Sequence, residues 1–273
     1  MKSFPNCKIN IGLNVVSKRP DGYHDIESVF YPIPFCDELE INPAAEFSFL
    51  QKGIPLECDS EKNLCVKAFR LLKEDFPKMG NVHICLTKNI PSGAGLGGGS
   101  SDAAFTLKML NSIFNLNIST PELEGYAVRL GADCPVFIEN RPRFASGLGN
   151  VFSETAVHLQ GYRLLLVKPD VGVSTAEAYS GVTPRTPAFD LRNIDRLPVS
   201  EWGNFAVNDF EKSIFEKLPV LAGIKEQIKT AGALYSAMSG SGSTIYGIFG
   251  HNSNPEILIR EFGERHFTKI LDL

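Results

Sequence analysis

The chain has 273 residues, of which 43% are hydrophobic and 21% charged, and its formal net charge is −4. This balance is typical of a globular protein, and the length allows one or two domains with a large core. The negative charge argues against nucleic acid as the main partner, because a phosphate backbone attracts a basic surface. The apolar runs are too short to cross a membrane and the first residues lack the apolar stretch of a secretory signal, so we expect a cytoplasmic protein with no membrane contact.

The cysteines and histidines argue against several kinds of site. The six cysteines form no CxxC pair and no zinc-type cluster with histidine, so reduced thiols are the simplest interpretation. The sequence also lacks the HExxH pattern of zinc hydrolases and the GxSxG elbow of α/β-hydrolases.

The first predicted element is a strand over residues 8–16, which read KINIGLNVV. Its apolar residues lie on one face, and the other face carries polar residues that include Lys8 and Asn10. The Pro-Asp-Gly core of SKRPDG, residues 17–22, predicts a turn. Further strands are expected around residues 29–33, 38–41 and 47–50.

The remaining elements mix helices and strands without strict βα repetition. Helices are expected over 61–76, from the serines after the glycine-rich stretch (Ser100 to Asp102 as candidate caps), from Thr120 to Gly131, and over 219–231. Strands are expected over 82–88, over 162–169 and on both sides of residues 239–243, with 172–198 mostly loop. This order predicts an α+β fold rather than a doubly wound sheet. The turn-rich residues 146–154 suggest a division into domains 1–150 and 151–273.

Residues 91–104 read PSGAGLGGGSSDAA, and we call their glycine-rich part, residues 91–99, the glycine loop. A flexible linker is disfavoured, because a strand and an amphipathic helix flank the loop closely. Gly93, Gly95 and Gly98 fit the GxGxxG pattern of an NAD-dependent oxidoreductase, but no acidic residue ends a strand about 20 positions further on. A phosphate cradle fits better, because glycines expose backbone N–H groups and a helix start adds positive potential.

Residues 91–104 as a whole resemble the motif P-x-x-x-G-L-G-S-S-A-A of the GHMP kinases, which include homoserine and mevalonate kinases. Five further segments resemble motifs of one branch of this family, in the same order: CKINIGLNV (7–15), RPDGYHDIESVF (19–30), GADCPVF (131–137), VNDFE (207–211) and MSGSGSTIYGIF (238–249). That branch uses ATP to phosphorylate a cytidine-diphosphate-linked substrate of the non-mevalonate isoprenoid pathway. The resemblance therefore implies a small-molecule kinase with two α+β domains, the first binding ATP, and an active site in the cleft between them.

The resemblance gives two residues a role in catalysis. Lys8 and Asp133 match the positions of the catalytic lysine and aspartate of the family. Asp133 would accept the proton of the substrate hydroxyl, and Lys8 would steady the developing charge. Without the resemblance, a solvated strand lysine and a turn aspartate would be the better explanation of these residues.

The resemblance also assigns binding roles. ATP phosphates would be bound by Pro91, Ser92, Gly93, Ala94, Gly95, Leu96, Gly97, Gly98, Gly99, Ser100 and Ser101, with Ser101 also a candidate contact for Mg²⁺. Tyr23 and His24 would read the cytosine, with Tyr179 as a facing aromatic side chain. Asn10, Ser239 and Gly240 would complete the substrate site, whereas Asn208 and Asp209 are expected to be structural. Residues 17–22 and 57–67 are candidates for the adenine pocket.

Two departures and three alternatives accompany this interpretation. Cys7 stands where the branch has alanine, and Asp102 stands where many relatives have asparagine, which would alter the charge balance near the phosphates. The alternatives are another GHMP kinase such as homoserine kinase, an NAD-dependent oxidoreductase, and a catalytically silent protein on this fold. The segment DGYHDIESVF argues against homoserine kinase, and the presence of both Lys8 and Asp133 argues against a silent protein. The oligomeric state does not follow from the sequence.

Overall fold

The computed structural model describes residues 1–55 and 59–273, which form two compact units. Unit one comprises Met1–Lys8, Pro32–Ser92 and Gly97–Arg141, and unit two comprises Ile9–Tyr31, Gly93–Leu96 and Pro142–Leu273. The units interleave along the chain, and the glycine loop supplies residues to both. A single domain boundary at residue 150 stays a prediction.

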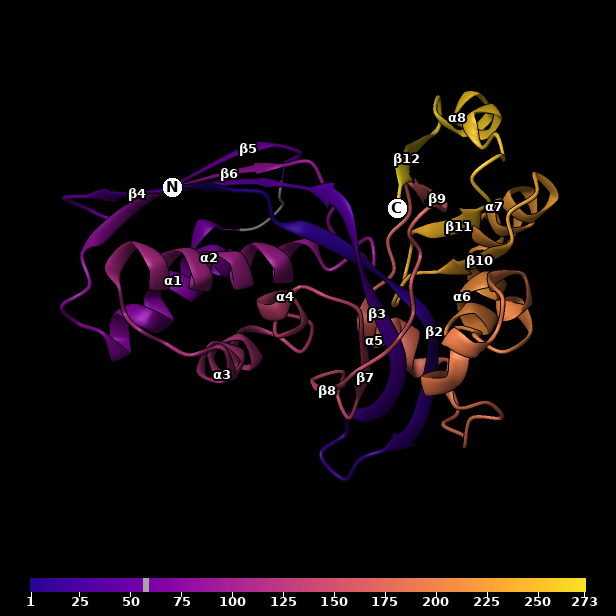
Figure 1. Cartoon of the computed structure of the whole chain (residues 1–273), viewed down its shortest axis with the longest axis horizontal. Coiled ribbons are helices and arrows are strands. Elements are labelled where there is room, and N and C mark those ends of the chain that lie inside the picture. Colours follow the sequence, from indigo (N-terminus) through magenta and orange to yellow (C-terminus); the bar gives the residue numbers. More distant parts are fainter. Residues whose placement is uncertain (56–58) are drawn as a thin grey trace. The chain divides into compact units, whose positions relative to one another are not determined.

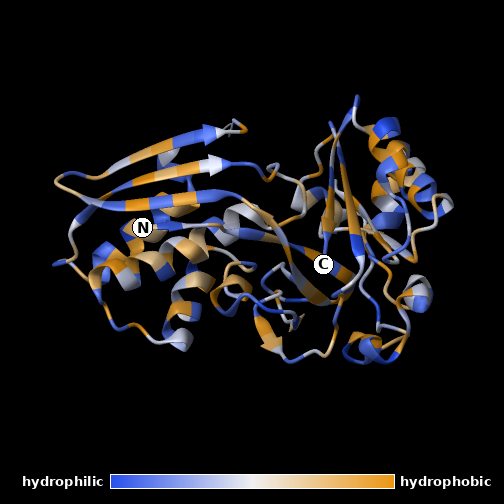
Figure 2. Ribbon diagram, turned by 45° about the horizontal axis from the view of Figure 1, so that its top comes forward, coloured by the Kyte–Doolittle hydropathy of each residue, from blue (hydrophilic) through white to orange (hydrophobic). Residues whose placement is uncertain are grey.

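Unit one is a four-stranded sheet with helices along one face (Figure 1). The strand order is β1 (Lys2–Ser3), β4 (Glu38–Ala44), β6 (Asn81–Lys88), β5 (Ser48–Gly53). The helices are the short 3-10 helix η1 (Ser60–Lys62), α1 (Leu64–Asp75), α2 (Gly98–Phe114), α3 (Thr120–Leu130) and α4 (Val136–Glu139). Val82, Ile84 and Leu86 of β6 are fully buried and alternate with partly exposed residues, so one face of the strand packs into the core, and Figure 2 shows the same alternation of hydropathy along the strands of this sheet.

Unit two contains a second four-stranded sheet, whose core includes Leu165, Val167, Ile224, Ile228 and Phe249. The strand order is β10 (Tyr235–Met238), β11 (Ile245–Phe249), β9 (Arg163–Pro169), β12 (His266–Asp272). The helices are α5 (Thr175–Ser180), η2 (Leu191–Arg196), η3 (Val199–Asn204), α6 (Glu211–Lys217), α7 (Pro219–Thr230) and α8 (Glu256–Phe262). A third sheet, with most of its residues in unit two, has the order β2 (Asn6–Lys18), β3 (His24–Cys36), β7 (Arg143–Ser146), β8 (Val151–Ser153).

The predicted α+β class is confirmed, as are the strands and helices expected before residue 100, with ends shifted by a few residues. In the first long strand, β2, the polar face is buried as well as the apolar one: Lys8 and Asn10 are each only 2% exposed. The strand alternates as expected, but other elements cover both of its faces.

Two predicted helix caps were wrong. Helix α2 begins at Gly98 and its N-cap is Gly97, so Ser100 to Asp102 lie inside the helix. The N-cap of α3 is Ser119, which forms a capping box with Glu122, rather than Thr120. In both cases the helix starts one or more residues before the position that side-chain preference suggested.

The region beyond residue 170 holds more regular structure than the sequence suggested. Helices α5 and η2 lie within the stretch 172–198, which was expected to be mostly loop, and helix α8 and strand β12 were not anticipated.

The cysteines of the described residues are free thiols: Cys7, Cys36, Cys65, Cys85 and Cys134. Cys58 lies outside the described residues. Among the helices that the structure describes, none has both the length and the apolar character needed to cross a membrane.

Three charged side chains are buried together in unit one, and we call them the Lys88 cluster. Lys88 forms ion pairs with Asp37 and with Asp102, and the three side chains are at most 3% exposed. Burial raises the pKa of Asp102 to about 7, with Asp37 adding to the rise and Lys88 opposing it. Two carboxyl groups thus share one ammonium group in the core.

The Lys88 cluster predicts a pH dependence of stability. Because the pKa of Asp102 is about 7 in the folded protein and 3.8 as a model group, the folded state keeps a proton that the unfolded state loses between these values. The free energy of unfolding should therefore fall as pH rises from about 4 to about 7 and then level off, by on the order of 4 kcal/mol relative to Asp102→Asn.

Urea denaturation of the protein and of Asp102→Asn across this pH range measures the difference between the two. Other carboxyl groups cancel in the comparison. Parallel curves would show that Asp102 ionises in the folded state as it does in the unfolded chain.

Candidate active site

Lys8 and Asp133 form an ion pair in unit one. Lys8 Nζ lies 3.3 Å from Asp133 Oδ2; the lysine side chain is 3% exposed and the aspartate side chain 36% exposed. Asp133 follows the C-cap of α3 at Gly131 and precedes α4, so two helix ends fix its position. The pair presents an accessible carboxylate supported by a buried ammonium group, an arrangement suited to accepting a proton.

The thiol beside this carboxylate is unsuited to nucleophilic catalysis. Burial raises the pKa of Cys134 to about 12, with the charge of Asp133 adding to the rise and a hydrogen bond with Ser100 opposing it. A thiol with so high a pKa is almost entirely protonated at neutral pH and therefore a poor nucleophile. Of the two adjacent side chains, the carboxylate of Asp133 is thus the candidate for catalysis.

At two positions the glycine loop lies so close to neighbouring atoms that a side chain would clash. Gly95 has a φ of +73°, and a Cβ atom built on it would lie 1.9 Å from the carbonyl oxygen of Ser239. Gly97 has a φ of +69°, and a Cβ atom there would lie 3.2 Å from both Lys8 Cε and a ring atom of Phe137. Both positions need glycine for the left-handed backbone and for the close approach.

The start of helix α2 leaves backbone donors available. Its N-cap, Gly97, forms no side-chain cap, and the N–H of Ser101 makes an intrahelical bond to the carbonyl of Gly97. The three N–H groups of Gly98, Gly99 and Ser100 therefore lie in the first turn, where an α-helix offers no acceptor of its own. Together with the helix dipole they favour an anion.

The two serines that follow the glycines, Ser100 and Ser101, differ in accessibility. Ser100 is partly exposed and Gly99 is exposed, whereas Ser101 is fully buried. The hydroxyl of Ser101 has no hydrogen-bond partner among the described residues. Of the two hydroxyls, only that of Ser100 is open to solvent.

In unit two, Ser239 links the glycine loop to the first long strand. Its hydroxyl donates to the carbonyl of Gly95 at 2.7 Å, and the backbone N–H of Asn10 lies 3.3 Å from the same oxygen. The side chain of Asn10 donates to Ser28 Oγ at 2.9 Å, and its Oδ1 would be 3.3 Å from a Cβ at Gly240. The structure thus brings together four residues that the sequence assigned to binding: Gly95, Asn10, Ser239 and Gly240.

Two side chains that the sequence did not assign to the site hold this segment in place. Asn208 Nδ2 donates to the carbonyls of Met238 and Gly240, both at 2.8 Å, and Asn208 Oδ1 accepts from the N–H of Phe210. Glu211 Oε1 accepts from the N–H of Met238 at 2.7 Å. Asn208 is therefore structural, as expected: it supports residues 238–240 and accepts from Phe210, the residue that is the N-cap of α6. The VNDFE motif was the signal for this contact in the sequence.

His24 and Tyr179 stack on each other in unit two. Their ring centroids lie 4.8 Å apart with an interplanar angle of 15°, and Phe210 meets Tyr179 edge-on at 4.9 Å. Tyr23 is 65% exposed, at the end of a turn that ion pairs of Arg19 with Asp21 and Asp25 hold. A planar base inserted between two rings would need the ring centroids to lie about two stacking distances apart. The 4.8 Å between His24 and Tyr179 leaves no such space, so a base would stack on an outer face of the pair.

The sequence matches two family descriptions: GHMP kinases N terminal domain over residues 63–141, and GHMP kinases C terminal over residues 189–269. It is 53% identical to a 4-diphosphocytidyl-2-C-methyl-D-erythritol kinase of Bacteroides fragilis over 91% of this chain and 92% of that protein. A kinase of the same name from Parabacteroides distasonis is 55% identical, over 91% of this chain and 92% of the relative.

The chain belongs to the GHMP kinase family. The crystal structure of a 4-(cytidine 5'-diphospho)-2C-methyl-D-erythritol kinase superposes with a TM-score of 0.84 and 28% identity, over 99% of this chain and 98% of the other. A homoserine kinase from Cytophaga hutchinsonii superposes with a TM-score of 0.68 and 16% identity, over 97% and 93% of the two chains, and shares the fold. Membership in the family makes the chain a small-molecule kinase, and the oxidoreductase alternative finds no support.

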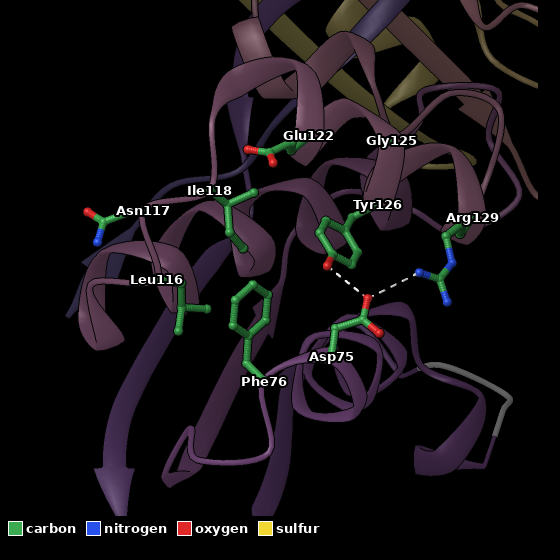
Figure 3. Close-up of a pocket in the computed structure, with 9 residues that line it drawn as sticks. All are labelled: Asp75, Phe76, Leu116, Asn117, Ile118, Glu122, Gly125, Tyr126 and Arg129. Atoms are coloured by element: carbon green, nitrogen blue, oxygen red, sulfur yellow. Dashed lines mark hydrogen bonds and ion pairs between the residues drawn. The ribbon is translucent and has the colours of Figure 1, made fainter.

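A pocket of about 400 Å³ in unit one contains none of the predicted site residues (Figure 3). It lies between the end of α1, the segment 116–118 and helix α3. On its wall Tyr126 donates to Asp75 at 2.8 Å, and Arg129 lies 3.5 Å from the same carboxylate. These polar groups satisfy one another.

The close approach at Gly95 yields a prediction. Gly95→Ala should lower the free energy of unfolding by about 3 kcal/mol or more, because it adds backbone strain and a clash with a backbone carbonyl. Gly93→Ala is the matched control: its φ is +59°, but nothing lies within 4 Å of the added Cβ, so it should cost only about 1 kcal/mol. Thermal or urea unfolding measures both, and equal losses would show that the close approach does not require glycine.

Proposed function

We propose that this GHMP kinase transfers the γ-phosphoryl group of ATP to the 2-hydroxyl of 4-diphosphocytidyl-2-C-methyl-D-erythritol. The observation that carries the proposal is the contact of the helix start with the ion pair. Gly97 approaches Lys8, Lys8 pairs with Asp133, and Ser100 bonds to Cys134 beside Asp133. Anion-binding backbone and a proton acceptor thus adjoin each other, as phosphoryl transfer requires.

The glycine loop fits the phosphates of ATP. The N–H groups at the start of α2 would donate to phosphate oxygens, and the absence of side chains at Gly95 and Gly97 lets the backbone approach them. Among the described residues no group of three His, Cys, Asp or Glu could hold a metal ion. Mg²⁺ accompanying ATP would therefore be held mainly by phosphate oxygens, with Ser101 as the candidate protein contact, and would neutralise phosphate charge.

Asp133 and Lys8 carry the chemistry in this proposal. Asp133 accepts the proton of the attacking hydroxyl, since its carboxylate is accessible and its position is fixed by two helix ends. Lys8, which is buried and cannot move far, keeps a positive charge beside the carboxylate and the attacking oxygen. The residues thus align the hydroxyl, remove its proton and stabilise charge, which is most of what catalysis of phosphoryl transfer needs.

Asp133→Asn tests the reaction and the proton acceptor together. With Mg-ATP, ADP formation should depend on the cytidyl substrate and not on homoserine or mevalonate, and the variant should lose about 10²- to 10⁴-fold in kcat. Asp75→Asn removes an exposed carboxylate elsewhere in unit one and is the control that should keep normal turnover. Near-normal turnover of folded Asp133→Asn would exclude Asp133 as the base. NADH binding without substrate-dependent formation of ADP would exclude the proposed kinase activity.

His24 and Tyr179 form the proposed cytosine platform, with Tyr23 at its rim. His24→Ala should raise KM for the cytidyl substrate about tenfold, the loss expected for one stacked base, and leave KM for ATP nearly unchanged. His83→Ala on β6, where the ring bonds to Ser48, is the matched control. An equal rise of both KM values would place His24 outside the cytosine site.

A further inference from the structure

The Lys88 cluster joins three elements of unit one. Lys88 is the last residue of β6, and its side chain points to the buried face that Val82, Ile84 and Leu86 define. Its Nζ bonds to Asp37, between β3 and β4, and lies 2.7 Å from Oδ2 of Asp102 on α2. The strand and the helix on either side of the glycine loop are thereby joined through one ammonium group.

The contacts of the cluster reach both ends of the loop. Asp37 Oδ1 accepts from the backbone N–H groups of Asn89 at 2.6 Å and Ile90 at 2.8 Å, just before the loop begins. At the other end, a Cβ on Gly98 would lie 2.9 Å from Ile90 Cγ2 and 3.4 Å from Lys88 Nζ. The first turn of α2 therefore rests on the residues that precede the loop.

We propose that Lys88, Asp37 and Asp102 are positioning residues that fix both ends of the glycine loop before ATP binds. Asp37 orients the backbone that enters the loop, Asp102 fixes the helix that leaves it, and Lys88 connects the two. The loop between these ends has lost much of its conformational freedom in advance.

The energetics favour positioning over simple stabilisation. Removing three charged groups from water is costly, and apolar side chains of similar volume often stabilise a core as well or better. The cluster also leaves Oδ1 of Asp102 without a hydrogen-bond partner among the described residues. What the charges supply is direction, because charge-assisted hydrogen bonds fix the angle and distance between elements in a way that apolar contacts do not.

The consequence for ATP rests on the proposed function, which assigns the phosphates to this loop. A loop held in place binds phosphate without first being ordered, so loss of the anchor should appear in KM for ATP more than in KM for the second substrate. Order within the loop itself can be measured without ATP, and that measurement does not depend on the proposed function.

Two substitutions at Asp102 separate positioning from folding. Asp102→Asn keeps an oxygen that can accept from Lys88, so near pH 7 it should keep the loop order and the KM for ATP of the unmodified protein. Asp102→Ala removes the contact but leaves Lys88 paired one to one with Asp37, so the chain should still fold. Leu110→Ala is the control for lost stability, since Leu110 is fully buried and lies about two turns further along the same helix.

Hydrogen exchange of the ATP-free proteins is the first readout. In Asp102→Ala the amides of Asn89, Ile90 and Ser101, which are hydrogen-bonded at the two ends of the loop, should exchange about tenfold faster, the size expected for losing a hydrogen bond to a charged group, with Asp102→Asn and Leu110→Ala close to the unmodified protein in this segment. Unchanged loop exchange in Asp102→Ala, or an equal increase in Leu110→Ala, overturns the proposal.

The second readout is KM, measured at the same pH. Asp102→Ala should raise KM for ATP about tenfold and change KM for the cytidyl substrate less than about threefold, and Asp102→Asn should restore KM for ATP. Faster loop exchange with an unchanged KM for ATP would support the positioning of the loop and overturn the assignment of ATP phosphates to it. Hydrogen exchange thus tests the positioning of the loop, and KM for ATP tests the assignment of the phosphates to it.

Discussion

The arrangement of the site depends on the close packing of one backbone segment on another. Gly95 lies against the carbonyl of Ser239 with no space for a side chain, the Ser239 hydroxyl donates back to Gly95, and the N–H of Thr244 donates to Ala94. Asn208 and Glu211 fix the segment that contains Ser239 through hydrogen bonds to the backbone of Met238. The glycines therefore serve two purposes, since they permit the fold of the loop and leave its N–H groups unobstructed.

Two buried lysines show how the surroundings of a charge determine its use. Lys8 pairs with a carboxylate that is 36% exposed, so the partner can meet a substrate. Lys88 pairs with two carboxylates that are at most 3% exposed, so they can meet only the protein. The first arrangement suits proton transfer and the second suits the fixing of elements, although the residue types are the same.

Much of the fold followed from local patterns, and the exceptions have physical reasons. Alternation located β2 and β6, and helical spacing located α1 and α2. The cap of α2 was misplaced because the left-handed backbone of Gly97 starts the helix before any side-chain cap. Helix α8 and strand β12 were missed, although β12 pairs along its whole length with the buried strand β9. That pairing joins distant segments and leaves little periodic signal in the sequence.

The sequence by itself determined which chemical groups are available and where the backbone must be glycine. It supplied the lysine, the aspartate, the aromatic pair and the family to which they belong, because motifs record local geometry and residue type. Only the tertiary structure decided which groups meet. The bond between Ser239 and Gly95 spans 144 positions and that between Lys88 and Asp37 spans 51. Such contacts depend on how whole sheets and helices pack, and local sequence does not encode that packing one residue at a time.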